Sequence, residues 1–137
     1  MNRAPRFDAI DHLHVFVKDR QAAEAWYGRV LGLHRLEALA HWATPQGPLT
    51  LGDAADQLHI ALFQRNECAN HNTIALRVSA KGFQAWQSHL DEVLTAKAQL
   101  VNHGGDAASL YFDDPDGNPY EITCYEVDAL QALGVLA

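Results

Sequence analysis

The chain has 137 residues, 48% of them hydrophobic and 20% charged, which suffices for one domain or for two small modules that share a core. Its formal net charge of −7 argues against partners that require a basic face, namely nucleic acids and anionic membrane surfaces. No apolar run approaches the ~20 residues that cross a bilayer, and no apolar signal core follows Met1, so we expect a cytoplasmic protein.

Residues 8–17 alternate between apolar and polar side chains, which predicts a half-buried strand. The polar face of this strand carries His12, His14 and Phe16. A helix is predicted next over 20–31, because Asp19 is a favourable N-cap and Gly32 a favourable residue to end a helix.

Three further strands complete the first half, and the second half repeats the same order. The first-half strands are expected at 34–43, 49–51 and 58–63. A polar connector without periodicity follows at 65–72. The second half is expected to form a strand at 73–78, a helix capped by Ser79, strands at 99–101, 109–113 and 120–125, and a short helix at 127–133.

The last two strands are joined by a turn whose chemistry is specific. Pro115 presets φ for the first turn position and Gly117 supplies a positive φ. The outgoing strand then places Glu121 and Thr123 on one face. A carboxylate in mid-strand between apolar neighbours suits a site better than a core. The alternative is an edge strand with Glu121 in bulk water.

The order βαβββ therefore occurs twice, and the first strand of each half can be overlaid on the other. Each half is small enough to be marginal alone, so we expect the halves to stabilise each other. We predict an α+β fold of two βαβββ modules, whose curved mixed sheets surround a concave cup with the helices on the outer face. The modules are expected at about 8–65 and 72–126, with a C-terminal tail at 127–137.

The strand faces that look away from the helices are unusually polar. They carry His12, His14, His59, Thr73, Arg77, Glu121 and Thr123. Such groups converging in a concavity indicate a binding site. His12 and Glu121 are the candidate metal ligands, since imidazole and carboxylate suit Zn²⁺, Fe²⁺, Mn²⁺ or Ni²⁺. The alternative for His12 is a structural histidine bonded to the backbone.

Two motifs frame the chain. The first comprises Asp11-His-Leu-His-Val-Phe-Val-Lys-Asp-Arg with Trp26-Tyr-Gly-Arg-Val-Leu-Gly-Leu33, and the second is Tyr111-Phe-Asp-Asp-Pro-Asp-Gly-Asn-Pro-Tyr-Glu-Ile. In this order and spacing they resemble the signatures of the vicinal oxygen chelate superfamily. That superfamily includes glyoxalase I, bleomycin-resistance proteins, fosfomycin-resistance enzymes and extradiol dioxygenases. The resemblance covers nearly the whole chain and is more specific for the fold than for the reaction.

The resemblance implies a divalent ion held from the inward strand faces, with His12 on the first strand and Glu121 on the last. Two family positions depart from the pattern. The second-module histidine falls on Thr73, and the extra carboxylate of glyoxalase I falls on Ala61. Ordinary glyoxalase I activity is therefore not expected. Two nearby histidines are alternative ligands, His59 and His71.

Other polar residues of the cup have candidate roles. His14 is a candidate general base beside the ion, together with Glu121, and Arg77 is a candidate clamp for an anionic substrate. The remaining candidate pocket residues are Thr73, Thr123, Tyr111 and Phe63. The alternatives are a solvated histidine, a surface ion pair and ordinary aromatic packing.

Two functions remain open. The first is a metal-dependent enzyme in which the ion acts as a Lewis acid in lyase, isomerase or dioxygenase chemistry. The second is a metal-free protein that sequesters a small molecule, as bleomycin-resistance proteins do; a domain used only for assembly is a weaker option. The resemblance also implies a homodimer, because relatives often build each cup from modules of two chains. Dimer contacts would cover the tail at 127–137, which we expect to be exposed.

Overall fold

The computed structural model describes residues 3–68 and 72–137, and these form two βαβββ modules followed by a short helix. The elements are β1 Leu13–Val17, α1 Arg20–Leu31, β2 His34–Arg35, η1 Glu37–Trp42, β3 Pro48–Gly52, β4 His59–Gln64, β5 Ile74–Arg77, α2 Ala80–Val93, β6 Gln99–Asn102, β7 Ala108–Asp113, β8 Pro119–Cys124 and α3 Val127–Ala132. The predicted repeat of one topology is confirmed.

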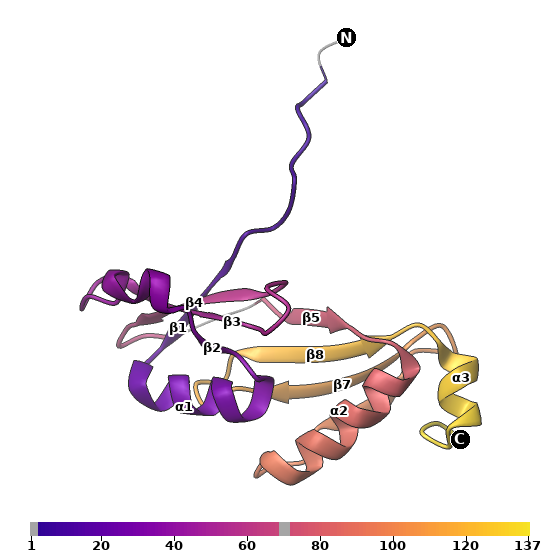
Figure 1. Ribbon diagram of the computed structural model, residues 1–137. Helices are drawn as coiled ribbons and strands as arrows, with labels where there is room; N and C mark the ends of the chain where they lie inside the picture. Colours follow the sequence, from indigo (N-terminus) through magenta and orange to yellow (C-terminus); the bar gives the residue numbers. More distant parts are fainter. Residues whose placement is uncertain (1–2, 69–71) are drawn as a thin grey trace.

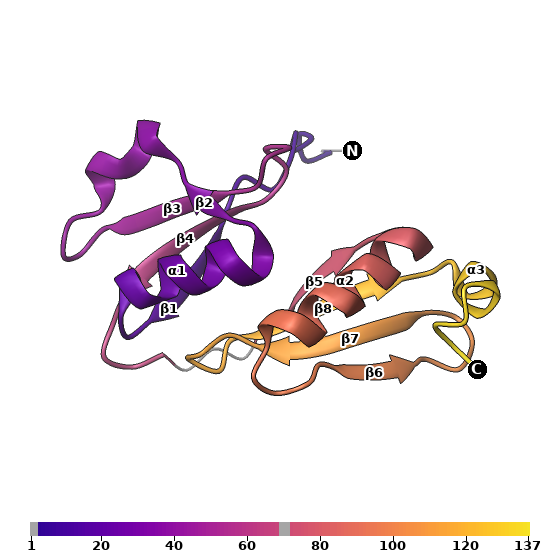
Figure 2. The same cartoon turned by 60° about the horizontal axis from the view of Figure 1, so that its bottom comes forward.

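Each module contains one four-stranded sheet, with strand orders β1-β4-β3-β2 and β5-β8-β7-β6. The first and last strands of a module run parallel, and the other neighbours run antiparallel. Helices α1 and α2 lie on the same side of the two sheets, below them in Figure 1. The opposite sheet faces, called helix-free below, carry neither α1 nor α2. Figure 2 shows the two modules side by side.

The two long helices begin where their capping residues predict. The Asp19 carboxylate accepts a hydrogen bond from the Ala22 N–H, and the Ser79 hydroxyl accepts one from the Gly82 N–H. Gly32 ends α1 in the left-handed region with φ of 68°. That conformation costs glycine little, because it has no Cβ to clash. None of the described helices combines the length and the hydropathy that a bilayer crossing needs.

The strand predicted at 34–43 is wrong for most of its length. Only His34–Arg35 pairs with β3, and Glu37–Trp42 forms the 3₁₀ helix η1 instead. The residues of η1 are Glu, Ala, Leu, Ala, His and Trp, which include no β-branched side chain and several helix formers. Local preference therefore favours a helical turn over further pairing with β3.

The C-terminal tail is not the exposed apolar segment that the sequence predicts. Helix α3 packs against α2, and Val127, Leu130 and Leu136 are buried. The Glu126 carboxylate accepts a hydrogen bond from the Ala80 N–H at 2.7 Å, which also serves the first turn of α2. The tail thus covers its own module, and a dimer is not required to explain its apolar composition.

A buried polar cluster joins the two modules. The Tyr27 hydroxyl of α1 donates to Asp114 Oδ2 at 2.7 Å and lies 2.9 Å from the Tyr120 hydroxyl. Asn118 Nδ2 donates to the same carboxylate oxygen at 2.7 Å, and the N–H groups of Asp116 and Asn118 donate to Oδ1. The turn that the sequence marks between β7 and β8 is therefore also the contact that positions module 1 on module 2. We call these residues the inter-module cluster.

Three further hydrogen bonds cross the same boundary. Asn118 Nδ2 donates to the Phe16 carbonyl at 3.1 Å, and the Lys18 N–H donates to Asp116 Oδ1 at 3.2 Å. On the helix side, His89 Nε2 donates to the Val30 carbonyl at 2.8 Å. The C-terminal end of β1 is thus held against the β7–β8 turn, while the N-terminal end, where His12 lies, is far from this contact along the strand.

The inter-module cluster predicts a loss of stability at alkaline pH. Burial raises the pKa of Tyr27 well above its ordinary value, with further contributions from Tyr120 and Asp114, and burial likewise raises the pKa of Tyr120. Below about pH 10 both phenols are neutral in the folded and the unfolded chain, so their contribution is fully present. Above that pH the unfolded chain loses protons that the folded chain keeps, and the free energy of unfolding falls.

The expected slope is about 1.4 kcal/mol per pH unit for each tyrosine. Urea unfolding at a series of pH values measures it. Tyr27→Phe is expected to make the alkaline slope shallower by about 1.4 kcal/mol per pH unit, because one titrating group is gone. An unchanged slope in this variant would contradict the assignment.

Candidate functional site

The helix-free face of module 1 carries a patch of two histidines and two phenylalanines, which are His12, His14, Phe16 and Phe63. The strand register places His14 beside Ala61 and Phe16 beside Phe63. His59 lies on the same face of β4 as Phe63, as predicted. Ala61 is 2% exposed and offers no donor atom, so β4 contributes no ligand at that position.

His12 and His14 point their ring nitrogens at each other. Their Nε2 atoms lie 3.0 Å apart, and the rings stack with centroids separated by 5.0 Å. On its other side, His12 Nδ1 lies 2.6 Å from Asp11 Oδ2. This pairing with a carboxylate assigns the proton to Nδ1 and leaves the Nε2 lone pair of His12 as an acceptor. The His12 side chain is 42% exposed, so a ligand can reach it.

An aromatic wall continues from His14 along the same face. The His14 and Phe63 rings lie 4.7 Å apart, and Phe16 meets Phe63 edge-on at 6.0 Å. The Arg65 guanidinium lies 5.1 Å from the centre of the Phe63 ring. Phe63 thus lies between two rings and a cation, and its role as a pocket residue stays a prediction. The sequence marked Arg65 only as the start of a connector.

Glu121 lies on the helix-free face of module 2, on a central strand and not on an edge. Its Oε1 accepts hydrogen bonds from the Ser109 hydroxyl at 2.6 Å and from the Tyr111 hydroxyl at 3.0 Å. These two hydrogen bonds hold the carboxylate through Oε1, and Oε2 is the oxygen that remains as a candidate donor to a ligand. The expectation of Glu121 in bulk water on an edge strand is therefore excluded, because β5 and β7 flank β8.

Ser109 and His103 are two neighbours of Glu121 that the sequence reading missed. His103 Nε2 lies 3.0 Å from the Tyr111 hydroxyl, which extends the chain of contacts from Glu121 to the β6–β7 loop. The hydrogen bond to Glu121 and burial raise the pKa of Tyr111, burial being the larger cause, so its hydroxyl keeps its proton and donates. The hairpin register sets Ser109 opposite Thr123 and Tyr111 opposite Glu121, so counting back from the turn would have found Ser109.

The other predicted site residues differ in their exposure and in their contacts. Thr73 precedes β5 and is exposed, and the Arg77 guanidinium lies 5.9 Å from the Tyr125 ring centre. Thr123 is buried beneath Ser109, where it supports the sheet instead of lining an open surface. His59 Nε2 is paired with Asp56 Oδ1 at 2.5 Å. His71 lies outside the described residues.

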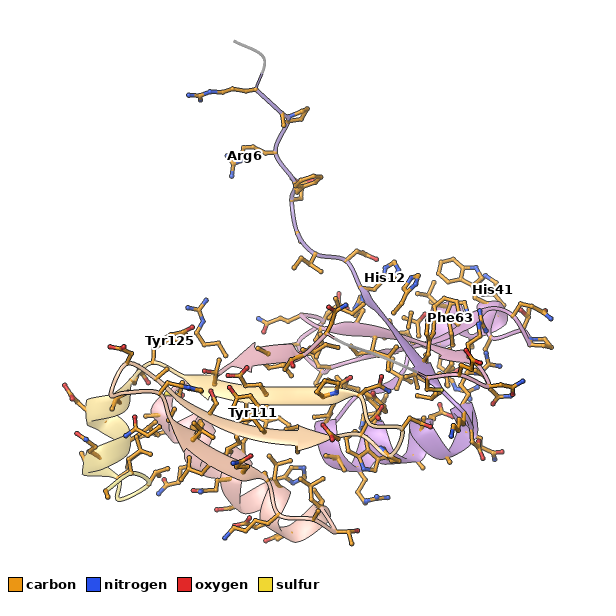
Figure 3. All side chains as sticks on the ribbon, turned by 180° about the vertical axis from the view of Figure 1, so that it is seen from behind. Arg6, His12, His41, Phe63, Tyr111 and Tyr125 are labelled. Carbon is orange, nitrogen blue, oxygen red and sulfur yellow. The ribbon has the colours of Figure 1, made fainter. Side chains whose placement is uncertain are left out.

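The donor atoms fit a divalent ion but lie on two modules. His12 offers an Nε2 lone pair with its opposite nitrogen held by a carboxylate, and Glu121 offers Oε2 with its other oxygen held by Ser109 and Tyr111. Such support is typical of metal ligands. Within residues 3–68 and 72–137, no three His, Cys, Asp or Glu side chains already form a group that could hold an ion. Figure 3 shows His12 and Phe63 on module 1, and Tyr111 and Tyr125 on module 2.

Comparison with known proteins gives one family and one fold. Residues 9–122 match the family model of the Glyoxalase/Bleomycin resistance protein/Dioxygenase superfamily. Lactoylglutathione lyase from Agrobacterium tumefaciens has a TM-score of 0.69 at 18% identity, over 88% of this chain and 96% of that chain. A glyoxalase/dioxygenase from Nostoc punctiforme has a TM-score of 0.65 at 22% identity, over 91% of this chain and 98% of that one.

A third solved structure carries a metal. The fosfomycin resistance protein FosX from Listeria monocytogenes, complexed with Mn(II) and a sulfate ion, has a TM-score of 0.64 at 14% identity. The alignment covers 94% of this chain and 99% of that chain. At these identities the solved structures establish the shared fold, and the chemistry has to be argued from the residues of this chain.

Proposed function

Because the chain belongs to the Glyoxalase/Bleomycin resistance protein/Dioxygenase superfamily, we propose that it binds a small molecule together with a divalent metal ion held by His12 and Glu121. The observation that carries this proposal is the support given to both side chains. Asp11 holds one nitrogen of His12, and Ser109 with Tyr111 holds one oxygen of Glu121, so each side chain is oriented through one of its two donor atoms. A solvated histidine or a structural carboxylate needs no such arrangement.

A divalent ion at this position supplies a Lewis acid for adjacent substrate oxygens, which suits lyase, isomerase or dioxygenase chemistry. The chain's own residues supply the rest of the site. Arg65 and Arg77, one on each module, attract an anionic substrate, while Phe16 and Phe63 give the cup an apolar wall. His103 hydrogen-bonds to the Tyr111 hydroxyl and keeps it oriented toward Glu121.

A second copy of the chain completes the site in this proposal. His12 lies at the end of β1 remote from the inter-module cluster, and Glu121 lies on the other module. A homodimer that sets module 1 of one protomer against module 2 of its partner would bring the two donor sets to one ion. The solved structure of FosX with Mn(II) makes a divalent ion a reasonable choice for this fold. The cytoplasmic location expected from the sequence remains part of this proposal.

A metal-free binding protein is the second candidate, and two residues favour it. Thr73 stands where the family's second-module histidine would be, and the buried Ala61 stands where a further carboxylate would be. A cup with an aromatic wall and two arginines can sequester a small anionic or aromatic ligand without an ion.

Elemental analysis separates the two candidates. The purified protein is loaded separately with Mn²⁺, Fe²⁺, Ni²⁺ and Zn²⁺, freed of excess ion and assayed for bound metal. The expected result is about one ion per chain for at least one of them. Loading of none of the four ions would remove the metal-dependent function and leave the sequestering protein.

A further inference from the structure

The spacing of His12, just before β1, and His14, within β1, suggests a ligand set different from that of the family pattern. We propose that His12 and His14 chelate the ion as a pair from one strand, so that His14 takes the place left by Thr73 and Glu121 supplies the carboxylate. This inference rests on the proposed metal site and assigns His14 as a ligand, where the sequence reading makes it a general base.

The distance between the two ring nitrogens matches a shared ion. The Nε2 atoms of His12 and His14 lie 3.0 Å apart. Two nitrogens that each lie roughly 2.1 Å from one ion, at a right angle to each other, are separated by roughly 3.0 Å. In the absence of an ion, a single proton between the two nitrogens accounts for the same approach. The separation of the two nitrogens therefore already suits a shared ion, and the rings have to turn their lone pairs from each other toward that ion when it binds.

The strand holds both rings in place. Residues i and i+2 of extended chain point to the same face, and the His12 ring, from the residue just before β1, stacks on the His14 ring of β1. The Asp11 carboxylate fixes the His12 ring through Nδ1, and the Phe63 ring packs against His14 at 4.7 Å. Because these contacts already restrict both side chains, little rotamer entropy remains to be lost when an ion binds.

Two histidines and one carboxylate form a facial set that leaves further positions open for a substrate. His14 makes this set complete without any donor at Thr73 or Ala61. His59 is a poorer choice for the third ligand, because its Nε2 is already paired with Asp56 at 2.5 Å. His59 is therefore a matched control for His14. Both are histidines on the helix-free face of module 1, but only His14 directs its Nε2 at His12.

The experiment compares wild type with His14→Ala, His59→Ala and His12→Ala. The affinity for Ni²⁺ is measured by competition with a chromophoric chelator, and pulsed electron paramagnetic resonance counts the imidazoles on Cu²⁺ added at one equivalent. Wild type and His59→Ala are expected to give the same affinity and two imidazoles. His14→Ala is expected to give one imidazole and an affinity lower by at least about a hundredfold, more than loss of an outer-shell contact causes.

The outcomes separate this inference from the proposed function. If the wild type binds no ion, the metal-dependent function fails and the chelating pair with it. If the wild type binds the ion and His14→Ala keeps both its affinity and its imidazole count, only the chelating pair is overturned. An unchanged count with a modest loss of affinity would make His14 a positioning residue for His12, which also overturns the inference. His14 is exposed, so the variant is expected to fold, and its circular dichroism and Tm check this.

Discussion

His12→Ala and Glu121→Ala are each expected to lose bound metal, and mixing the two variants is expected to restore about one quarter of the wild-type stoichiometry. Random exchange of subunits makes half of the dimers mixed. In a site built across two protomers, a mixed dimer has one site with both His12 and Glu121 and one site with neither. Half of the sites in half of the dimers are then intact.

A site built within one chain gives the opposite result. Each chain of the mixture lacks either His12 or Glu121, so no site is complete and the mixture binds no more metal than its components. Exchange is ensured by mixing in mild urea and dialysing, and metal is measured after gel filtration. Wild type mixed with itself is the control for losses during exchange. Light scattering on the same samples reports whether dimers are present, and a monomer would exclude the two-chain site.

Asp114→Ala is expected to lower the free energy of unfolding by roughly 3–5 kcal/mol, a large share of the stability of a domain of this size. The Asp114 carboxylate accepts hydrogen bonds from Tyr27, Asn118 and two backbone N–H groups, and it is 4% exposed. Its removal takes the acceptor from four donors, three of them in buried hydrogen bonds where water compensates poorly. Urea unfolding followed by fluorescence measures the change.

Asp113→Ala is the matched control, because Asp113 is the preceding residue of the same turn and is exposed. It is expected to change the free energy of unfolding by no more than about 0.5 kcal/mol. Tyr27→Phe removes one donor to Asp114 while keeping the ring. This change is expected to lower the free energy of unfolding by roughly 1.5–3 kcal/mol. A cost for Asp114→Ala within about 1 kcal/mol of that for Asp113→Ala would contradict the role of the inter-module cluster.

Short-range chemistry accounts for the features that the sequence predicts correctly. Asp19 and Gly32 bound α1 because a side-chain acceptor and a residue tolerant of positive φ act within one turn of the chain. Gly117, with φ of 80°, ends the turn between β7 and β8 for the same kind of reason. Alternation on β1 and β8 likewise determines that His12, His14 and Glu121 look away from the helices.

The error at 34–43 marks the limit of that approach. The first residues pair with the end of β3, and after Leu36, whose N–H still donates to the Thr50 carbonyl, the chain turns into η1 although β3 continues to Pro48. The apolar tail at 127–137 fails for a related reason, since composition does not reveal that α2 offers a surface to cover. Both features depend on what lies nearby in space.

The sequence by itself determined the repeated βαβββ order, the helix ends, the β7–β8 turn and the polar faces of the strands. The tertiary structure alone decided that Asp114 binds Tyr27 across the module boundary, that His14 directs its Nε2 at His12, and that Ser109 and Tyr111 hold Glu121. The first set follows from backbone preferences and capping within a few residues. The second set requires side chains to meet at distances and angles that only the packing of whole elements fixes.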